Sequence, residues 1–171
     1  MAVLISVDNG DLVFPSSVTD LPSFQSWFRS KDFPTIGKVI YYDGNVWIDP
    51  SSQQVLHCHV NSSLAAAIGG WTKHQPIGMT LCDGLRFTNQ DADLSTEPDV
   101  LFFTEAGLIS GKVKLMDGDA SLEIEGSPEI IVEVISPTSA KKDEKTLREK
   151  YYEAGVQEYW LNSSTPVSER R

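Results

Sequence analysis

Two acidic residues stand inside the two most apolar segments of the chain. Asp99 opens the run Asp99–Phe103, and Glu133 interrupts a run of isoleucine and valine over residues 130–135. Continuous apolar runs of this length are typical of strands that are covered on both faces. A carboxylate in such a strand would sooner take up a proton than stay charged, unless a cation or hydrogen-bond donors compensate it. The pattern therefore predicts a metal ion or a lysine close to Glu133.

The chemistry of the two carboxylates depends on whether their strands are neighbours in one sheet. If they are, Asp99 and Glu133 can converge, and one or two carboxylates completed by water and phosphate oxygens are what Mg²⁺ prefers. Such a site suits hydrolysis of a phosphodiester bond, because the cation neutralises charge on the phosphate and lowers the pKa of a bound water. The structural alternative is that Glu133 forms a buried ion pair with a lysine and Asp99 caps a turn after Pro98. Spacing alone leaves both interpretations open.

Two local signals organise the N-terminal part of the chain. Thr19 and Asp20 can cap a short helix that carries aromatic residues on one face. Asp43-Gly44 stands between two apolar runs, which predicts a β-hairpin over residues 39–48. We therefore expect an N-terminal helix followed by a hairpin.

Apolar spacing predicts the elements of the remaining chain. A helix is expected from about Gln53 to Ile68, where Gly69-Gly70 would end it. The other expected elements are a strand at 85–88, a polar link at 89–96, strands at 99–103, 130–135 and 158–161, a weaker hairpin at 113–124, and a last helix capped by Thr138 or Ser139 and ended by Gly155. The final strand–helix–strand unit needs a right-handed crossover. The expected fold class is α/β (α+β), a mixed β-sheet flanked by helices.

Length, net charge and cysteine content limit the classes of protein to which the chain can belong. The chain has 171 residues, a formal net charge of −10 and two cysteines, which favours one domain with reduced thiols. We expect this domain over residues 1–162, with the helix and hairpin in 1–50, the core in 51–162 and a loose polar tail at 163–171. The absence of a basic leader favours a cytoplasmic protein, and no apolar run is long enough for a membrane span. The acidity argues against tight, non-specific DNA binding, although a compact site could hold DNA through metal ions and lysines.

Two further groups of residues favour structural roles. His57-Cys58-His59 offers zinc ligands, but adjacent residues on a helix point in different directions and no second pair of ligands occurs. A partly buried helix segment is therefore preferred over a zinc site. Trp47 and Trp71 are expected in the core rather than as base-stacking platforms, because basic residues do not interleave with them.

Several motifs occur in a fixed order along the chain. They are Asp43-Gly44-Asn45-Val46-Trp47-Ile48-Asp49, Asp83-Gly84, Glu97-Pro98-Asp99, Glu133-Val134-Ile135-Ser136-Pro137, Lys142-Asp143, Gly155-Val156 and Glu158-Tyr159-Trp160-Leu161. In this order the motifs resemble the Uma-two family of restriction endonucleases, over most of residues 24–161. The chain departs from the family at Gln53, where relatives carry glutamate, and at Glu129 and Asn162, where they carry aspartate.

The resemblance implies a restriction-endonuclease-like fold of the PD-(D/E)XK superfamily. In that superfamily Asp99 and Glu133 would bind magnesium, with manganese as a possible substitute, and DNA would be the substrate. The superfamily's lysine would stand two residues after the glutamate, where this chain has Ile135. The family's pattern therefore implies a lysine from the following helix, and Gln53 could orient a water.

Helix geometry ranks the candidate lysines. The first turns of the helix lie closest to Glu133, and a rise of about 1.5 Å per residue puts Lys150 roughly 12 Å beyond Lys142. Lys142 and Lys145 stand three residues apart, so that both could face the sheet. We rank Lys142 first, because it is nearer the strand and belongs to the Lys-Asp pair that resembles the family's.

These observations favour a magnesium-dependent DNA endonuclease, with Asp99 and Glu133 as metal ligands and Lys142 or Lys145 as the cationic residue. The rival interpretation is a catalytically inactive module that keeps the nuclease fold for interaction or dimerisation. A homodimer is expected from the acidic surface, the small size and the need to cut two strands of a duplex, and two-fold assembly is the commonest. The enzyme interpretation requires that Asp99, Glu133 and a lysine ammonium converge.

Overall fold

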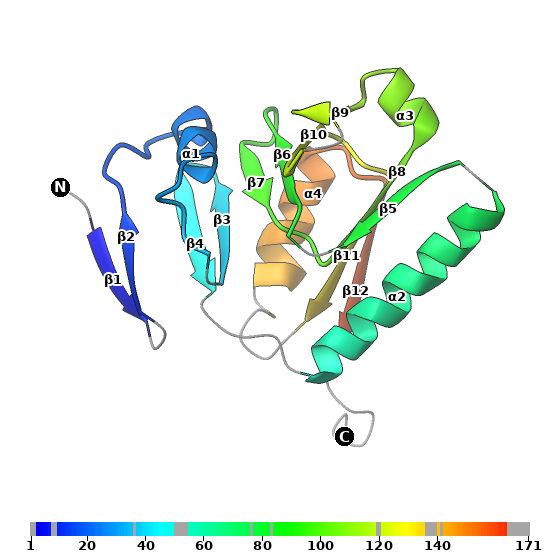
Figure 1. The fold of residues 1–171 in the computed structure, drawn as a ribbon, viewed down its shortest axis with the longest axis horizontal. Coiled ribbons are helices and arrows are strands. Elements are labelled where there is room, and N and C mark those ends of the chain that lie inside the picture. The colour runs from blue at the N-terminus through cyan, green and yellow to red at the C-terminus, as the bar shows by residue number, and fades with distance from the viewer. Residues whose placement is uncertain are drawn as a thin grey trace.

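Two mixed β-sheets form the core of the described part of the chain (Figure 1). The computed structural model describes residues 3–7, 10–35, 37–49, 55–75, 77–82, 84–118, 121–135, 140 and 142–163. Among these residues, a six-stranded sheet has the order β4 (Asn45–Asp49), β3 (Lys38–Tyr42), β7 (Leu94–Thr96), β6 (Arg86–Asn89), β10 (Glu123–Gly126) and β9 (Val113–Leu115). A four-stranded sheet has the order β12 (Glu158–Ser163), β11 (Ile130–Ile135), β8 (Val100–Thr104) and β5 (Gly78–Cys82). Strands β1 (Val3–Val7) and β2 (Gly10–Phe14) form a separate hairpin.

The described helices differ in length and in what they cover. They are α1 (Leu21–Phe28), α2 (Val55–His74), α3 (Glu105–Ile109) and α4 (Arg148–Glu153), which follows directly on a π-helical segment, Lys142–Leu147. Helix α2 packs along the four-stranded sheet, and α4 lies near the centre of the molecule (Figure 1). None of the described helices is both long enough and apolar enough to span a membrane.

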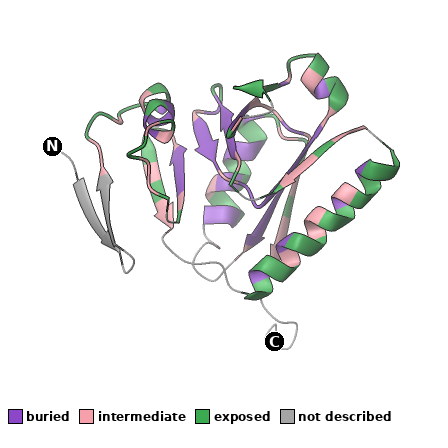
Figure 2. Cartoon of the chain, in the orientation of Figure 1, coloured by how far each residue is buried: buried purple, intermediate pink, exposed green. Residues whose placement is uncertain are grey.

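The two central strands of the four-stranded sheet, β8 and β11, are buried on both faces, as their continuous apolar runs predict. Successive side chains of a strand point to opposite faces. Val100 and Val132 accordingly pack with Ile68 of α2, whereas Leu101 and Ile131 join the main core. The main core also contains α4 residues and strands of the six-stranded sheet. Buried residues gather on the central strands and on α4, while the outer side of α2 is exposed (Figure 2).

The two N-terminal predictions are confirmed. Asp20 caps α1 and accepts a hydrogen bond from the backbone N–H of Ser23 at 2.9 Å. Asp43 and Gly44 join β3 to β4 with positive φ angles of 46° and 72°. Paired positive φ angles are what a two-residue hairpin turn requires, and Asp-Gly supplies them at low cost. The expected fold class, a mixed α/β structure with an N-terminal helix and hairpin, is confirmed as well.

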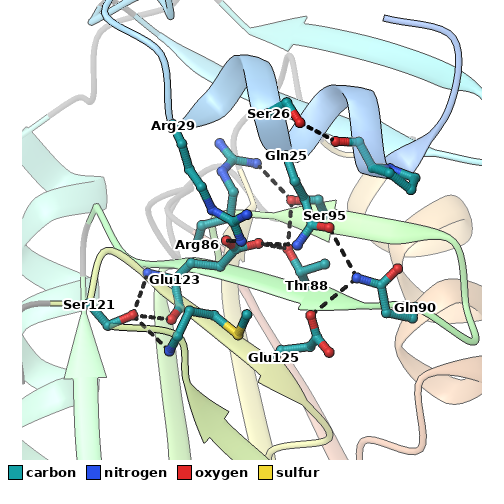
Figure 3. A network of polar contacts seen from close by, with 12 residues as sticks. Gln25, Ser26, Arg29, Arg86, Thr88, Gln90, Ser95, Ser121, Glu123 and Glu125 are labelled. Carbon is teal, nitrogen blue, oxygen red and sulfur yellow. Dashed lines mark hydrogen bonds and ion pairs between the residues drawn. The ribbon is translucent and has the colours of Figure 1, made fainter. Parts of the chain in front are cut away.

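Helix α1 is anchored on the six-stranded sheet by a buried polar network (Figure 3). The carboxylate of Glu123 accepts hydrogen bonds from Gln25 Nε2 at 2.7 Å, Thr88 Oγ1 at 2.7 Å and Arg29 Nη2 at 2.6 Å. These donors come from α1, its C-terminal end and β6. Glu123 is thus fully hydrogen-bonded although only 2% of its surface is exposed.

Arg86 of β6 extends this network towards the start of β8. The guanidinium is fully buried, donates to the carbonyl of Val39 at 3.0 Å and pairs with Glu97. Its central carbon also lies 4.6 Å from the ring centre of Phe28 on α1, a cation–π contact. Because Glu97 stands two residues before Asp99, the Arg86–Glu97 pair fixes the chain where it enters β8.

Helix α2 departs from the sequence prediction at its C-terminal end. The helix passes through Gly69-Gly70 and ends at His74. Beyond the glycines, the ring of Trp71 packs 6.0 Å from that of Phe102, and Thr72 is buried. Packing on the sheet therefore continues the helix where local propensity would end it.

Two other expectations also need correction. Trp71 and Trp47 are not core residues, because 50% and 37% of their surfaces are exposed. Strand β7 lies inside the predicted polar link at 89–96, and β5 and α3 were not predicted at all. Such short elements show little periodicity, and β7 exists because it pairs with β3 and β6. Gln53, Asp83, Thr138 and Ser139 lie outside the described residues, as does the predicted tail beyond Ser163, the last residue of β12.

Candidate active site

Asp99 and Glu133 come together on neighbouring strands. Strand β11 pairs with β8 in antiparallel register, with Val132 opposite Val100. Continuing this register by one residue places Glu133 opposite Asp99. The exposed fractions of Asp99 and Glu133 are only 1% and 3%. The strand neighbourhood that the sequence analysis required is therefore present.

Asp99 is held ionised by its partners. Its Oδ2 accepts a hydrogen bond from the backbone N–H of Val134 at 2.7 Å, and its Oδ1 lies 2.5 Å from Lys38 Nζ and 3.3 Å from His57 Nε2. Burial alone would raise the pKa of Asp99, but the hydrogen bond from His57 and the charge of Lys38 lower this pKa well below its usual range. Asp99 is thus a carboxylate at any physiological pH.

Glu133, in contrast to Asp99, favours its protonated form. Burial, followed by the nearby charge of Asp99, raises the pKa of Glu133 from 4.5 to about 8, although Lys38 and Lys142 partly offset these effects. Its Oε1 accepts a hydrogen bond from the hydroxyl of Tyr151 at 2.7 Å. Without a further cation, this carboxyl group holds a proton at neutral pH. A further positive charge near Glu133 would lower this pKa and favour the charged carboxylate.

Lys142 is buried, and its charge acts on Glu133, whereas Lys145 is exposed. Lys142 has an exposed fraction of 6% and forms an ion pair with Asp143 at 2.9 Å. The expectation that both lysines face the sheet is wrong, because they lie in a π-helical segment, where residues three apart do not share a face as they do in an α-helix.

Lys150 turns inward, but towards a different part of the molecule. Its Nζ pairs with Asp43 at 2.6 Å and with Glu153 at 2.7 Å, and donates to the carbonyl of Ala92. Lys150 therefore ties the end of α4 to the β3–β4 turn and takes no part in the site. This placement agrees with the sequence analysis, in which helix geometry put Lys150 too far from Glu133.

The donor set fits a hard divalent cation better than zinc. Of the histidine and cysteine run, Cys58 and His59 are exposed, and His57 alone points to Asp99. Among the described residues, no group of three histidine, cysteine, aspartate or glutamate side chains is arranged to hold a metal ion. Two facing carboxylates that leave most positions to water and substrate oxygens are the usual arrangement for Mg²⁺.

Two of the three positions at which the sequence departs from the Uma-two pattern lie among the described residues. Glu129 accepts hydrogen bonds from the backbone N–H of Thr104 and from Lys112 Nζ, both at 2.8 Å, and so supports the start of α3. Asn162 lies in β12, in register with Val134. Gln53, which could orient a water, is not among the described residues.

Sequence reasoning did not assign His57, Lys38 or Tyr151 to the site, although all three contact the carboxylates. His57 could have been found, because it precedes Asn61, Leu64 and Ile68 on one helical stripe of α2. Lys38 and Tyr151 gave no such signal. Lys38 opens a hairpin strand of the other sheet, and only the tertiary fold brings its ammonium to Asp99.

The mixed α/β fold of the chain has a counterpart among solved structures. The chain is similar to a crystal structure from Anabaena variabilis ATCC 29413, described as "a putative nuclease belonging to DUF820", with a TM-score of 0.65. The sequence identity is 23%, over 84% of this chain and 73% of the other, so this likeness establishes the fold.

Sequence comparison then gives the family. The model of the Uma2 family, described as "Putative restriction endonuclease", matches residues 22–168. The chain belongs to the Uma2 family, as its motifs predicted. No curated protein matches the chain. Family and fold together support a nuclease.

Proposed function

We propose that the chain is a magnesium-dependent endonuclease that hydrolyses phosphodiester bonds in DNA, with Asp99 and Glu133 as the metal ligands. The observation that carries this proposal is the pair of buried carboxylates on facing strands, with the pKa of Glu133 raised to about 8. Strongly shifted carboxyl groups that face one another are typical of functional sites. A plain structural ion pair would not leave one carboxyl group short of positive charge.

A divalent cation at this site would supply charge neutralisation at the phosphate and a lower pKa for a coordinated water. Asp99 is already ionised and is oriented by the backbone N–H of Val134. Glu133 would release its proton to become the second ligand, while Tyr151 fixes the direction of its carboxylate. Magnesium or manganese would bind weakly, since two carboxylates provide few of the six ligands.

Lys142 is the candidate for the cationic catalytic residue. Its buried ammonium acts on the charge of Glu133 and is held by Asp143. Asp143 is in turn fixed through its backbone carbonyl, which accepts a hydrogen bond from Tyr159 at 2.9 Å. We propose that Lys142 stabilises the negative charge that develops on the phosphate oxygens, a contribution whose loss costs about a hundredfold or more in rate.

DNA binding by such an acidic chain would be confined to the site, because a net charge of −10 repels phosphates elsewhere. We also propose a homodimer, since one active site cuts one strand and two-fold symmetry matches the duplex. Light scattering at micromolar concentration tests the dimer. The mass of a single chain, with and without DNA, would contradict it.

Plasmid cleavage tests the proposed function. Supercoiled DNA should be nicked or linearised with Mg²⁺ or Mn²⁺ and left intact in EDTA, and Asp99→Asn and Glu133→Gln should abolish cleavage. Glu123→Gln is the matched control, because Glu123 is equally buried but serves the α1 network. Full activity in Glu133→Gln would overturn the proposal.

One observation favours a second candidate, the catalytically inactive module. Lys38 already neutralises Asp99 in the way that a structural ion pair would. This candidate predicts neither cleavage nor divalent-cation binding, in the intact protein or in any lysine variant. The same assays therefore separate the two functions.

A further inference from the structure

Lys38 reaches the carboxylates from the other sheet. It is the first residue of β3, in the six-stranded sheet, whereas Asp99 directly precedes β8, in the four-stranded sheet. The Lys38 side chain keeps 25% of its surface exposed, and Gly37 before it has a φ of 74°. A long side chain at the open end of a hairpin, partly in solvent, has room to swing away from the carboxylates.

The ammonium of Lys38 stands among acidic groups. It contacts Asp99 Oδ1 at 2.5 Å, and the charges of Glu133 and Glu97 act on it as well. In the ion pairs of the described residues, no other lysine or arginine is bonded to Asp99 or Glu133. Lys38 thus provides the direct positive charge at the place where two carboxylates meet.

We infer that Lys38 is a tethered competitor of the metal ion, which holds Asp99 in the metal-free protein and must withdraw into solvent when a divalent cation binds there. This inference rests on the proposed function and adds to it a residue that sets the affinity for metal. It also explains how one site can show features of both a buried ion pair and a metal centre.

The contacts of Asp99 make the two cations mutually exclusive. Oδ2 is used by the backbone N–H of Val134, and Oδ1 is used by Lys38, with His57 Nε2 at 3.3 Å. A divalent cation binds carboxylate oxygens at about 2.0 to 2.6 Å, so that an ammonium on the same oxygen would be pressed against it. Two positive charges at such a distance repel strongly in a partly buried site.

Lys142 differs from Lys38 in the features that would allow withdrawal. Its side chain is 5% exposed, and its partner Asp143 is 3% exposed. The Lys142–Asp143 pair is therefore fixed, whereas the Lys38–Asp99 pair can open. We assign Lys142 to the reaction and Lys38 to control of metal occupancy.

Chemical labelling tests the withdrawal directly. The protein is treated with an amine-acetylating ester, first in EDTA and then in saturating Mg²⁺, and acetylation is quantified by mass spectrometry. We expect Lys38 to be protected in EDTA and acetylated severalfold faster with Mg²⁺, while the exposed Lys145 reacts equally in both. Unchanged labelling of Lys38, when calorimetry shows that Mg²⁺ is bound, would overturn the inference.

Calorimetry of Lys38→Met provides the second measurement. Removing the competitor should tighten Mg²⁺ binding about tenfold or more, equivalent to about 1.4 kcal/mol. Lys150→Met is the matched control, because Lys150 is also buried and ion-paired but lies away from the site, and it should bind Mg²⁺ as the unmodified protein does.

The outcomes separate this inference from the proposed function. Mg²⁺ binding that is equal or weaker in Lys38→Met would overturn the inference and leave the proposed function standing. Binding by Lys38→Met alone, with none by the unmodified protein, would support the inference in its strongest form. Absence of binding in both proteins would remove the metal site and the inference together.

Discussion

The molecule contains two buried clusters of charge that are built in opposite ways. In the network under α1, Glu123 receives three hydrogen bonds, and Arg86 meets Glu97, a backbone carbonyl and an aromatic ring. In the other cluster, Asp99 and Glu133 face each other on neighbouring strands. The first cluster thus pairs its carboxylates with guanidinium groups, whereas the second brings two carboxyl groups together and, among the described residues, bonds only Asp99 directly to an ammonium, that of Lys38.

The difference indicates that the first cluster stabilises the fold and that the second is the candidate for binding a cation. Carboxylates that already have ion-pair partners gain little from a further cation, whereas two neighbouring carboxyl groups are stabilised in their charged form by one. Burial and the charge of Asp99 raise the pKa of Glu133 to about 8, which indicates that the nearby cations do not fully compensate the two carboxylates. Variants in the first cluster should therefore affect stability rather than metal binding, and variants in the second should affect metal binding and pH dependence.

The largest expected effect is that of Arg86→Met on stability. Removing the guanidinium leaves Glu97 without its partner and the aromatic residues of α1 without their cation, which should lower the free energy of unfolding by about 3–5 kcal/mol. Denaturant unfolding measures this change, with the exposed Arg148→Met as the control. A loss below about 1 kcal/mol would show that the network does not hold α1.

The next largest expected effect is that of Lys142→Ala on activity. Loss of the buried ammonium should slow Mg²⁺-dependent cleavage by about a hundredfold, or about 2.7 kcal/mol in the barrier. Lys145→Ala, three residues away and exposed, should cleave normally, and circular dichroism should show that both variants are folded. Loss of cleavage in Lys145→Ala with full activity in Lys142→Ala would reverse the assignment.

The smallest of these effects, when it is counted per pH unit, concerns the stability of the metal-free protein. Folded Glu133 keeps its proton up to a pH of about 8, whereas the unfolded chain releases it near 4.5. The contribution of Glu133 to stability is therefore fully present below pH 4.5 and is lost as the pH rises through about 8, by up to about 1.4 kcal/mol for each pH unit.

Glu133→Gln isolates this contribution. The variant cannot titrate, yet it keeps an acceptor for the Tyr151 hydroxyl. Unfolding in EDTA between pH 5 and pH 9 should show the unmodified protein losing stability relative to Glu133→Gln as pH rises. Parallel curves for the two proteins would mean that Glu133 titrates normally.

Much of the fold could be predicted because its signals are local. The Asp43-Gly44 turn and the Asp20 cap each need only a few adjacent residues. The continuation of α2 past Gly69-Gly70 could not be predicted, since it depends on the contact between Trp71 and Phe102 of another element. Local propensity gives way to tertiary packing at such places.

The residues of the candidate site could likewise be predicted only in part. Asp99 and Glu133 could be found, because an acidic residue in an apolar strand is visible in the sequence. The contribution of Lys38 could not be predicted, since 61 residues separate it from Asp99 and it belongs to the other sheet. The placement of Lys142 and Lys145 on different sides also needed the structure, because no signal in the sequence indicated the π-helical segment.

Titration of the protein with Mn²⁺ in a calorimeter tests the central claim most directly, because it asks whether the facing carboxylates bind a divalent cation. We predict one weak site per chain, binding that strengthens from pH 6 to pH 8 as Glu133 yields its proton, no binding in Glu133→Gln, and normal binding in Glu123→Gln. Unchanged Mn²⁺ binding in Glu133→Gln would contradict the account, because the cation would then lie elsewhere.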